Sequence, residues 1–143
     1  MRQRGRWGSL LIMTALLQWG CTGMQSMGAT DVLTGLLTSQ LGVTSNQAMG
    51  GVGSMLSLAK ERLPSMDFMS LTKLIPGADT YMNTAKNLGA VTGPVGDRAG
   101  LTSAFSRLGM GPDMVPKFTQ VLSNFVGKAG GQPASNLVMQ AVQ

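Results

Sequence analysis

Residues 36–63, LLTSQLGVTSNQAMGGVGSMLSLAKERL, decide the fold. Apolar residues recur there at spacings of three and four, which is typical of amphipathic helices. Gly42 is placed to end a first helix, because glycine readily adopts the left-handed conformation that terminates many helices. Thr44 and Gln47 then form a T-x-x-Q capping box, in which each side chain bonds an otherwise free backbone amide. Pro64 ends the second helix. The stretch therefore predicts a helix–turn–helix hairpin.

Three glycines lie inside the second predicted helix, where each costs about 1 kcal/mol relative to alanine. Either another helix approaches closely at these positions, or a ligand meets the bare backbone. Close packing is the commoner reason for a glycine within a helix, and it is the reading we favour. The ligand reading defines a candidate partner groove made of Gly50, Gly51, Gly53, Met55, Phe118 and Phe125.

Outward from this hairpin, helical patterns cover most of the remaining chain. The first helix runs from Asp31, with Thr30 as its N-cap, and Ser65 and Asp79 are placed to cap two short helices. Residues 89–100, GAVTGPVGDRAG, predict a linker or mobile loop. Further helices are expected over 101–108, over 112–126 and from Ser135 onward. The pattern predicts an all-α fold, a small bundle of about six or seven short helices.

The chain repeats itself across the glycine-rich loop. When Leu41-Gly42 is aligned with Leu108-Gly109, Gly51 falls opposite Phe118. Both copies read as a helix, a glycine stop and a new helix start. We interpret them as two related helix–turn–helix hairpins, with the glycines of the first facing the phenylalanines of the second. Coincidence of amphipathic spacing is the alternative.

Three segments carry a family resemblance: residues 36–63, LIPGAD at 74–79, and SAFSRLGMGPDMVPKFTQVLSNFV at 103–126. They resemble the VcgC/VcgE-like bacterial family of unknown function (domain of unknown function 2780). The likeness covers about residues 31 to 142. It implies an exported, all-helical envelope protein, and it brings no activity that could be carried onto particular residues.

The N-terminal segment has the layout of a secretory signal. Three arginines within the first six residues precede an uncharged apolar run over 10–17, too short to span a bilayer as a helix. We expect a signal peptide over 1–20, a flexible tether over 21–30, and a single helical domain over 31–143. Cys21, the only cysteine, stands where a bacterial lipoprotein carries its lipid. The predicted location is the cell envelope, as an outer-membrane lipoprotein or, without the lipid, a soluble periplasmic protein.

Charge and composition argue against several functions. Three of the eleven basic residues belong to the predicted signal, which leaves eight against six acids and no basic cluster. Nucleic-acid binding, which needs several phosphates neutralised together, is therefore not expected. The sequence has no histidine, the commonest general base and metal ligand. Asp31, Asp79 and Asp113 stand at expected helix starts, where capping explains them.

Two S-x-x-K pairs, Ser57 with Lys60 and Ser70 with Lys73, have the spacing of a serine nucleophile and its lysine. The companion motifs of the enzymes that use this pair are absent. We therefore expect no enzymatic activity and no cofactor.

Methionines are unusually frequent, with twelve in the chain. Thioethers at a spacing of three or four residues can bind Cu(I), although they more often fill helical cores or adaptable grooves. The candidate copper ligands are Met24, Met27, Met66, Met69, Met110 and Met114.

The sequence thus predicts a lipid-anchored, non-catalytic interaction module for an unidentified envelope protein, peptide or lipid. The alternative is a soluble periplasmic carrier of a small ligand or Cu(I) that uses the methionine pairs.

Overall fold

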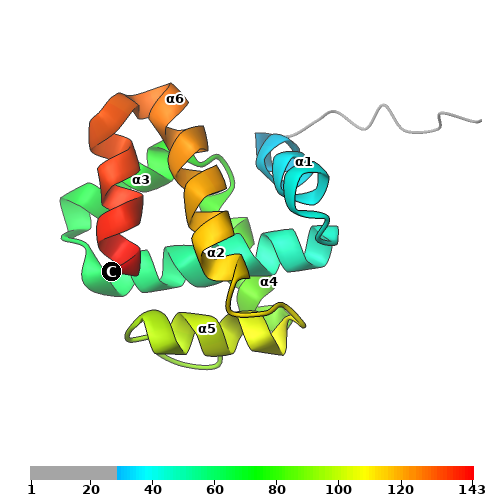
Figure 1. Ribbon diagram of the computed structural model, residues 1–143. Helices are drawn as coiled ribbons and strands as arrows, with labels where there is room; N and C mark the ends of the chain where they lie inside the picture. The colour runs from blue at the N-terminus through cyan, green and yellow to red at the C-terminus, as the bar shows by residue number, and fades with distance from the viewer. Residues whose placement is uncertain (1–28) are drawn as a thin grey trace, which may run out of the picture.

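The computed structural model describes residues 29–143, and within that range the chain forms six α-helices and no strand (Figure 1). The all-α prediction is confirmed. The helices are α1 (Ala29–Leu41), α2 (Ser45–Arg62), α3 (Ser65–Leu74), α4 (Ala78–Asn87), α5 (Arg98–Arg107) and α6 (Met114–Val142). None of these helices is long and apolar enough to cross a membrane.

The α1–α2 hairpin forms as its local signals predict. Gly42 has a φ of 68°, and its amide donates to the carbonyl of Thr38 at 3.0 Å, which closes α1. The Gln47 amide donates to Thr44 Oγ1 at 3.2 Å, and the Thr44 amide donates to Gln47 Oε1 at 3.0 Å. This reciprocal capping box starts α2, which ends just before Pro64.

Helix α2 lies at the centre of the bundle and contacts all five other helices (Figure 1). Its residues from Gly50 to Ala59 are all buried. A buried helix of this kind needs small residues wherever a neighbour approaches closely, because a larger side chain would overpack the core.

The three glycines of α2 each admit a different neighbour. A Cβ on Gly50 would stand 2.7 Å from Leu108 Cδ2, and one on Gly51 would collide with the ring of Phe118. On Gly53 it would collide with the carbonyl oxygen of Tyr81 in α4. The close-packing reading of these glycines is therefore the one that the bundle adopts.

The second hairpin is built from α5 and α6. Gly109 follows α5 with a φ of 77°, matching Gly42 of the first hairpin. Helix α6 breaks at Gly131 (φ 73°, ψ −166°) and continues on the far side of the break to Val142. The two limbs of α6 are joined by a hydrogen bond from Ser135 Oγ to the carbonyl of Ser123 at 2.9 Å. The separate last helix expected from Ser135 is this second limb.

Helix caps differ from the predictions in several places. Thr30 lies within α1 rather than before it, and Ser65 is the first residue of α3, whose N-cap is Pro64. Asp79 lies in the first turn of α4, after Gly77, and makes no capping hydrogen bond. The side chain of Asp31 is outside the described part of the structure.

Asp113 also fails to cap, because its carboxylate is engaged elsewhere. Its Oδ2 accepts from Lys117 Nζ at 2.9 Å, and this hydrogen bond and the lysine charge lower the pKa of Asp113 below its ordinary value. The side chain that does cap is Asp97, whose Oδ1 accepts from the Gly100 amide at 2.9 Å to start α5.

Candidate functional site

The structure corrects the candidate partner groove at the glycines of α2. Gly50, Gly51, Gly53, Met55 and Phe118 are buried, and Phe125 is half-buried. The space that a partner would enter is already filled by Leu108, Phe118 and Tyr81 of this chain. These residues form part of the core, and the surface hollow beside α2 and α4 is lined by others.

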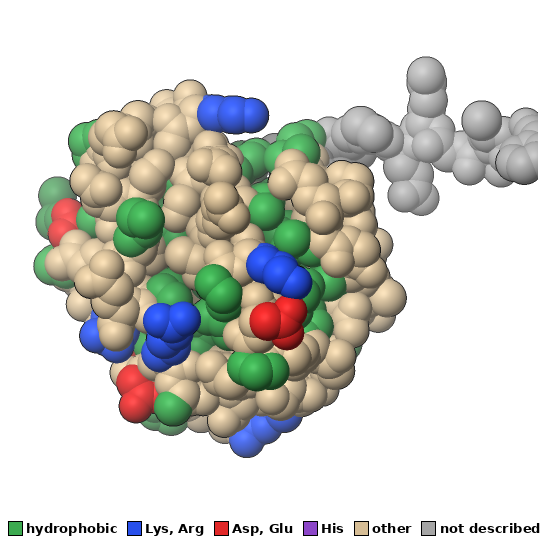
Figure 2. Space-filling model, in the orientation of Figure 1, with side chains coloured by type: hydrophobic (Ala, Val, Ile, Leu, Met, Phe, Trp, Pro, Cys, Tyr) green, Lys and Arg blue, Asp and Glu red, His purple; other side chains and the backbone are tan. Residues whose placement is uncertain are grey.

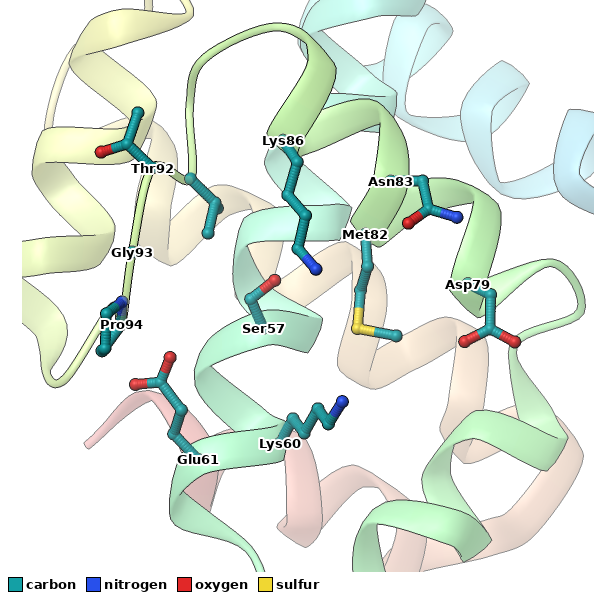
Figure 3. A pocket seen from close by; sticks show the side chains of 11 residues that line it. Ser57, Lys60, Glu61, Asp79, Met82, Asn83, Lys86, Thr92, Gly93 and Pro94 are labelled. Carbon is teal, nitrogen blue, oxygen red and sulfur yellow. The ribbon is translucent and has the colours of Figure 1, made fainter.

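A cavity of about 810 Å³ lies between α2, α4 and the loop 88–97 (Figure 3). We call it the loop pocket. Helix α2 contributes Ser57, Lys60 and Glu61 at spacings of three and four, which places them on one helix face. Helix α4 contributes Asp79, Met82, Asn83 and Lys86, which also recur at spacings of three and four and share one helix face. The loop contributes residues 91–94.

Glu61 of α2 holds the loop wall of the pocket in place through two hydrogen bonds. Glu61 Oε1 accepts from the Val95 amide at 2.8 Å, and Oε2 accepts from the Gly96 amide at 2.7 Å. Gly96 has a φ of 75°, a conformation in which glycine avoids the strain of a side chain. One carboxylate thus satisfies two successive backbone amides.

Helix α5 fastens the same loop from the other side. Arg107 Nη1 donates to Thr92 Oγ1 at 2.9 Å and to the carbonyl of Ala90 at 3.4 Å. Ala90, Val91 and Val95 are buried. The glycine-rich segment predicted as a linker or mobile loop is therefore held by hydrogen bonds and packing, and its last three residues belong to α5.

Two lysines of the loop pocket have no acidic partner. Figure 3 shows the amines of Lys60 and Lys86 directed into the hollow from α2 and α4. Across the described residues the single salt bridge joins Lys117 to Asp113. Because both oxygens of Glu61 bond loop amides, that carboxylate is turned toward the loop rather than toward either lysine.

The remaining lining mixes polar and apolar groups. Ser57 is buried, and its hydroxyl donates to the carbonyl of Gly53 at 2.8 Å, which leaves the oxygen lone pairs free to accept. The thioether of Met82 and the amide of Asn83 lie beside the lysines (Figure 3). The backbone amides of Thr92 and Gly93 have no hydrogen-bond acceptor within residues 29–143.

The S-x-x-K pairs are not arranged as a nucleophile and its base. Ser57 donates its proton to Gly53, and Ser70 Oγ donates to the carbonyl of Met66 at 2.9 Å. Neither hydroxyl is hydrogen-bonded to a lysine among the described residues. Ser57 and Lys60 both line the loop pocket.

The candidate copper ligands are dispersed. Met66 and Met69 are exposed on α3, at 75% and 52%, whereas Met110 is buried and Met114 half-buried. Met24, Met27 and Cys21 lie outside the described residues. Within 29–143 no three histidine, cysteine or acidic side chains gather as a metal site.

Basic side chains do not form one continuous surface on the face that Figure 2 shows. Sequence reasoning treated the lysines as isolated and so missed the loop pocket. A signal was present in the matching three-residue spacings of Ser57–Lys60 and Asn83–Lys86, but only the packing of α2 on α4 brings these residues to one pocket.

Comparison with known proteins gives one match. A family model described as "Protein of unknown function VcgC/VcgE (DUF2780)" matches residues 18–143. No curated protein matches the chain, and neither does any solved structure.

Proposed function

The chain belongs to the VcgC/VcgE family of proteins of unknown function, and from that premise we propose that it is an exported, lipid-anchored envelope protein that acts as a non-catalytic binding module. The observation that carries the binding role is the loop pocket, where two unpaired ammonium groups face a hollow under a fastened loop. Its volume of about 810 Å³ lies within the range of ligand sites. The group that enters belongs to an envelope protein, peptide or lipid or, in the alternative carrier role, is a free small ligand.

Preorganisation of the pocket supports binding. Glu61 and Arg107 hold the loop in place from two sides, so a ligand need not first order that wall. Removing this ordering cost leaves more of the contact energy for affinity. Binding is favoured over catalysis because the sequence lacks histidine and the pocket serine already donates its proton to Gly53.

A site-specific photo-crosslinker tests the pocket in intact envelopes. Asn83 is exposed and lines the pocket, whereas Thr80 is exposed on α4 and does not line it. A crosslinking residue at Asn83 is expected to capture a defined adduct that the same residue at Thr80 does not. Equal labelling from both positions, or none from Asn83, would reject the pocket as the binding site.

The anchor rests on Cys21, which follows the apolar run over 10–17. Cys21→Ser is expected to release the protein from the membrane fraction, because it removes the site of the proposed lipid anchor. Mass spectrometry of the N-terminal peptide checks the modification directly. A wild-type protein found in the soluble fraction with an unacylated N-terminal peptide would instead support a soluble periplasmic protein.

One observation favours the alternative, a carrier of Cu(I). Met66 and Met69 lie on adjacent turns of α3 with exposed side chains, and soft thioethers select Cu(I). Met66→Leu with Met69→Leu would then abolish Cu(I) binding, whereas Met139→Leu, also exposed, would not. Failure of the purified protein to compete with a Cu(I) chelator would remove this alternative.

A further inference from the structure

We infer that the loop pocket recognises a phosphate group, either free phosphate or a phosphomonoester. This inference rests on the proposed function, since it names the ligand chemistry of the same pocket. It is carried by the charges and donors that the packing of α2, α4 and the loop brings together.

The lining carries two lysines and two carboxylates, so its formal charge is zero, and a dianion is favoured by the two ammonium groups that make no salt bridge. Lys60 and Lys86 each carry a positive charge into the hollow without an acidic partner (Figure 3). Of the two carboxylates in the lining, Glu61 is committed to the Val95 and Gly96 amides. Asp79 forms no salt bridge with either lysine. A group with two negative charges would neutralise both ammoniums, whereas a single carboxylate would leave one unpaired.

The uncharged donors suit the several acceptor oxygens of a phosphate. Asn83 offers two N–H donors from α4. The unbonded amides of Thr92 and Gly93 lie on the loop that faces the lysines. Gly93 has open space where a Cβ would stand, so an oxyanion can approach its backbone. Lysine contributes to phosphate sites as a compact point charge, and backbone amides add charge-assisted hydrogen bonds.

Titration of the full-length protein in detergent micelles with inorganic phosphate tests this at constant ionic strength. The backbone signals of Thr92 and Gly93 and the side-chain amide signals of Asn83 are expected to shift saturably in NMR spectra. Lys60→Met and Lys86→Met should each weaken phosphate binding about tenfold, and the double variant about a hundredfold. Lys73→Met, which removes an exposed lysine of α3 outside the pocket, is the matched control and should leave the affinity unchanged.

The two lysine substitutions are expected to leave the fold intact. The side chains of Lys60 and Lys86 are exposed and make no hydrogen bond within the described chain, so thermal unfolding should be unchanged. Absence of a saturable shift overturns the inference, as does an equal loss in the Lys73 variant. If phosphate does not bind while the crosslinker at Asn83 still captures a partner, the inferred ligand class is wrong, but the loop pocket remains the proposed binding site.

A short-chain lipid separates the two sources of the group. Binding of dihexanoyl phosphatidic acid at least tenfold tighter than inorganic phosphate supports a lipid headgroup. Equal or weaker binding than that of inorganic phosphate supports a soluble phosphate. Dihexanoyl phosphatidylcholine carries a phosphodiester, and equally tight binding of it would overturn the inference, because the acyl chains alone would then explain the affinity.

Discussion

Gly51 of α2 and Phe118 of α6 hold matching positions in the two hairpins, and they lie directly against each other. A Cβ on Gly51 would stand 3.0 Å from Cδ1 of Phe118 and closer still to Cε1. Phe118 is fully buried and makes an edge-to-face contact with Phe105, with ring centroids 5.0 Å apart. Equivalent positions meet in this way when two related units pack with two-fold symmetry. The contact between them favours the repeat over coincidence.

Gly51→Ala is expected to destabilise the protein by about 1–3 kcal/mol, because the added Cβ would force the fully buried Phe118 ring to shift. Gly51→Leu should cost more. The control is Gly35→Ala in α1, where a Cβ meets nothing within 4 Å, and this change should stabilise by about 0.5–1 kcal/mol. Chemical denaturation measures all three. A stabilising Gly51→Ala would show that the helices are further apart than the structure has them.

Gln47 joins the two hairpins as well as capping α2. Its Oε1 accepts from Thr44, while its Nε2 donates to the carbonyl of Leu108 at 3.0 Å. Gln47→Glu keeps the acceptor but replaces the donor with a charged oxygen, so we expect a loss of about 1–3 kcal/mol. Asn46→Asp adds the same charge at the same helix end without this bond. Similar melting temperatures for the two variants would contradict the linking role.

Leu41 and Leu108 precede the two glycine stops, and both are half-buried rather than fully buried. Truncation of either to alanine should therefore cost about 1–2 kcal/mol, less than the roughly 2–5 kcal/mol of a buried leucine. Leu37→Ala, at a fully buried position of α1, should show the larger loss. Gln40→Ala, on the exposed side, should be nearly neutral. A Leu41 change as costly as Leu37 would contradict the observed burial.

Glu61→Gln should loosen the loop that walls the pocket. The amide that replaces one carboxylate oxygen presents a donor to a backbone donor, so one of the two bonds to Val95 and Gly96 is lost. Amide hydrogen exchange at these two residues is expected to quicken about tenfold, the equivalent of a lost hydrogen bond of about 1.4 kcal/mol. Arg62→Gln, one residue along and exposed, should leave both exchange rates unchanged. Unaltered exchange in Glu61→Gln would show that packing alone fixes the loop.

Lys117→Met should raise the pKa of Asp113, because the hydrogen bond and charge that lower it come from Lys117. A carboxyl whose pKa is lowered by folding contributes stability above its unfolded-state pKa, and that contribution disappears as the pH falls through the folded-state value. The pair is exposed, so its effect on melting should be small and should fade with salt. NMR titration of Asp113 in both proteins measures the shift. An identical pKa in the variant would mean that Lys117 does not set it.

The sequence by itself determined the helices and those of their ends that local signals fix, namely the glycine stops after α1 and α5 and the capped start of α2. These signals, Gly42, Gly109 and the Thr44–Gln47 capping box, act within about four residues along the chain. Their effect can therefore be predicted without knowing which segments pack against a helix. Which aspartate caps a helix was harder to predict from the sequence. Asp97 and Asp113 both precede helices, yet a lysine four residues on takes the carboxylate of Asp113 away from the backbone.

Only the tertiary structure decided what surrounds α2. Gly50, Gly51 and Gly53 look alike in sequence, but each meets a different neighbour, and those neighbours lie between 28 and 67 residues away. The loop pocket depends on the same long-range packing, since Glu61 reaches amides 34 and 35 residues further on. Periodicity specifies which face of a helix is buried, because that follows from the 3.6-residue turn. It does not specify which segment covers that face, because that choice is made by the fit of side chains distant in the chain.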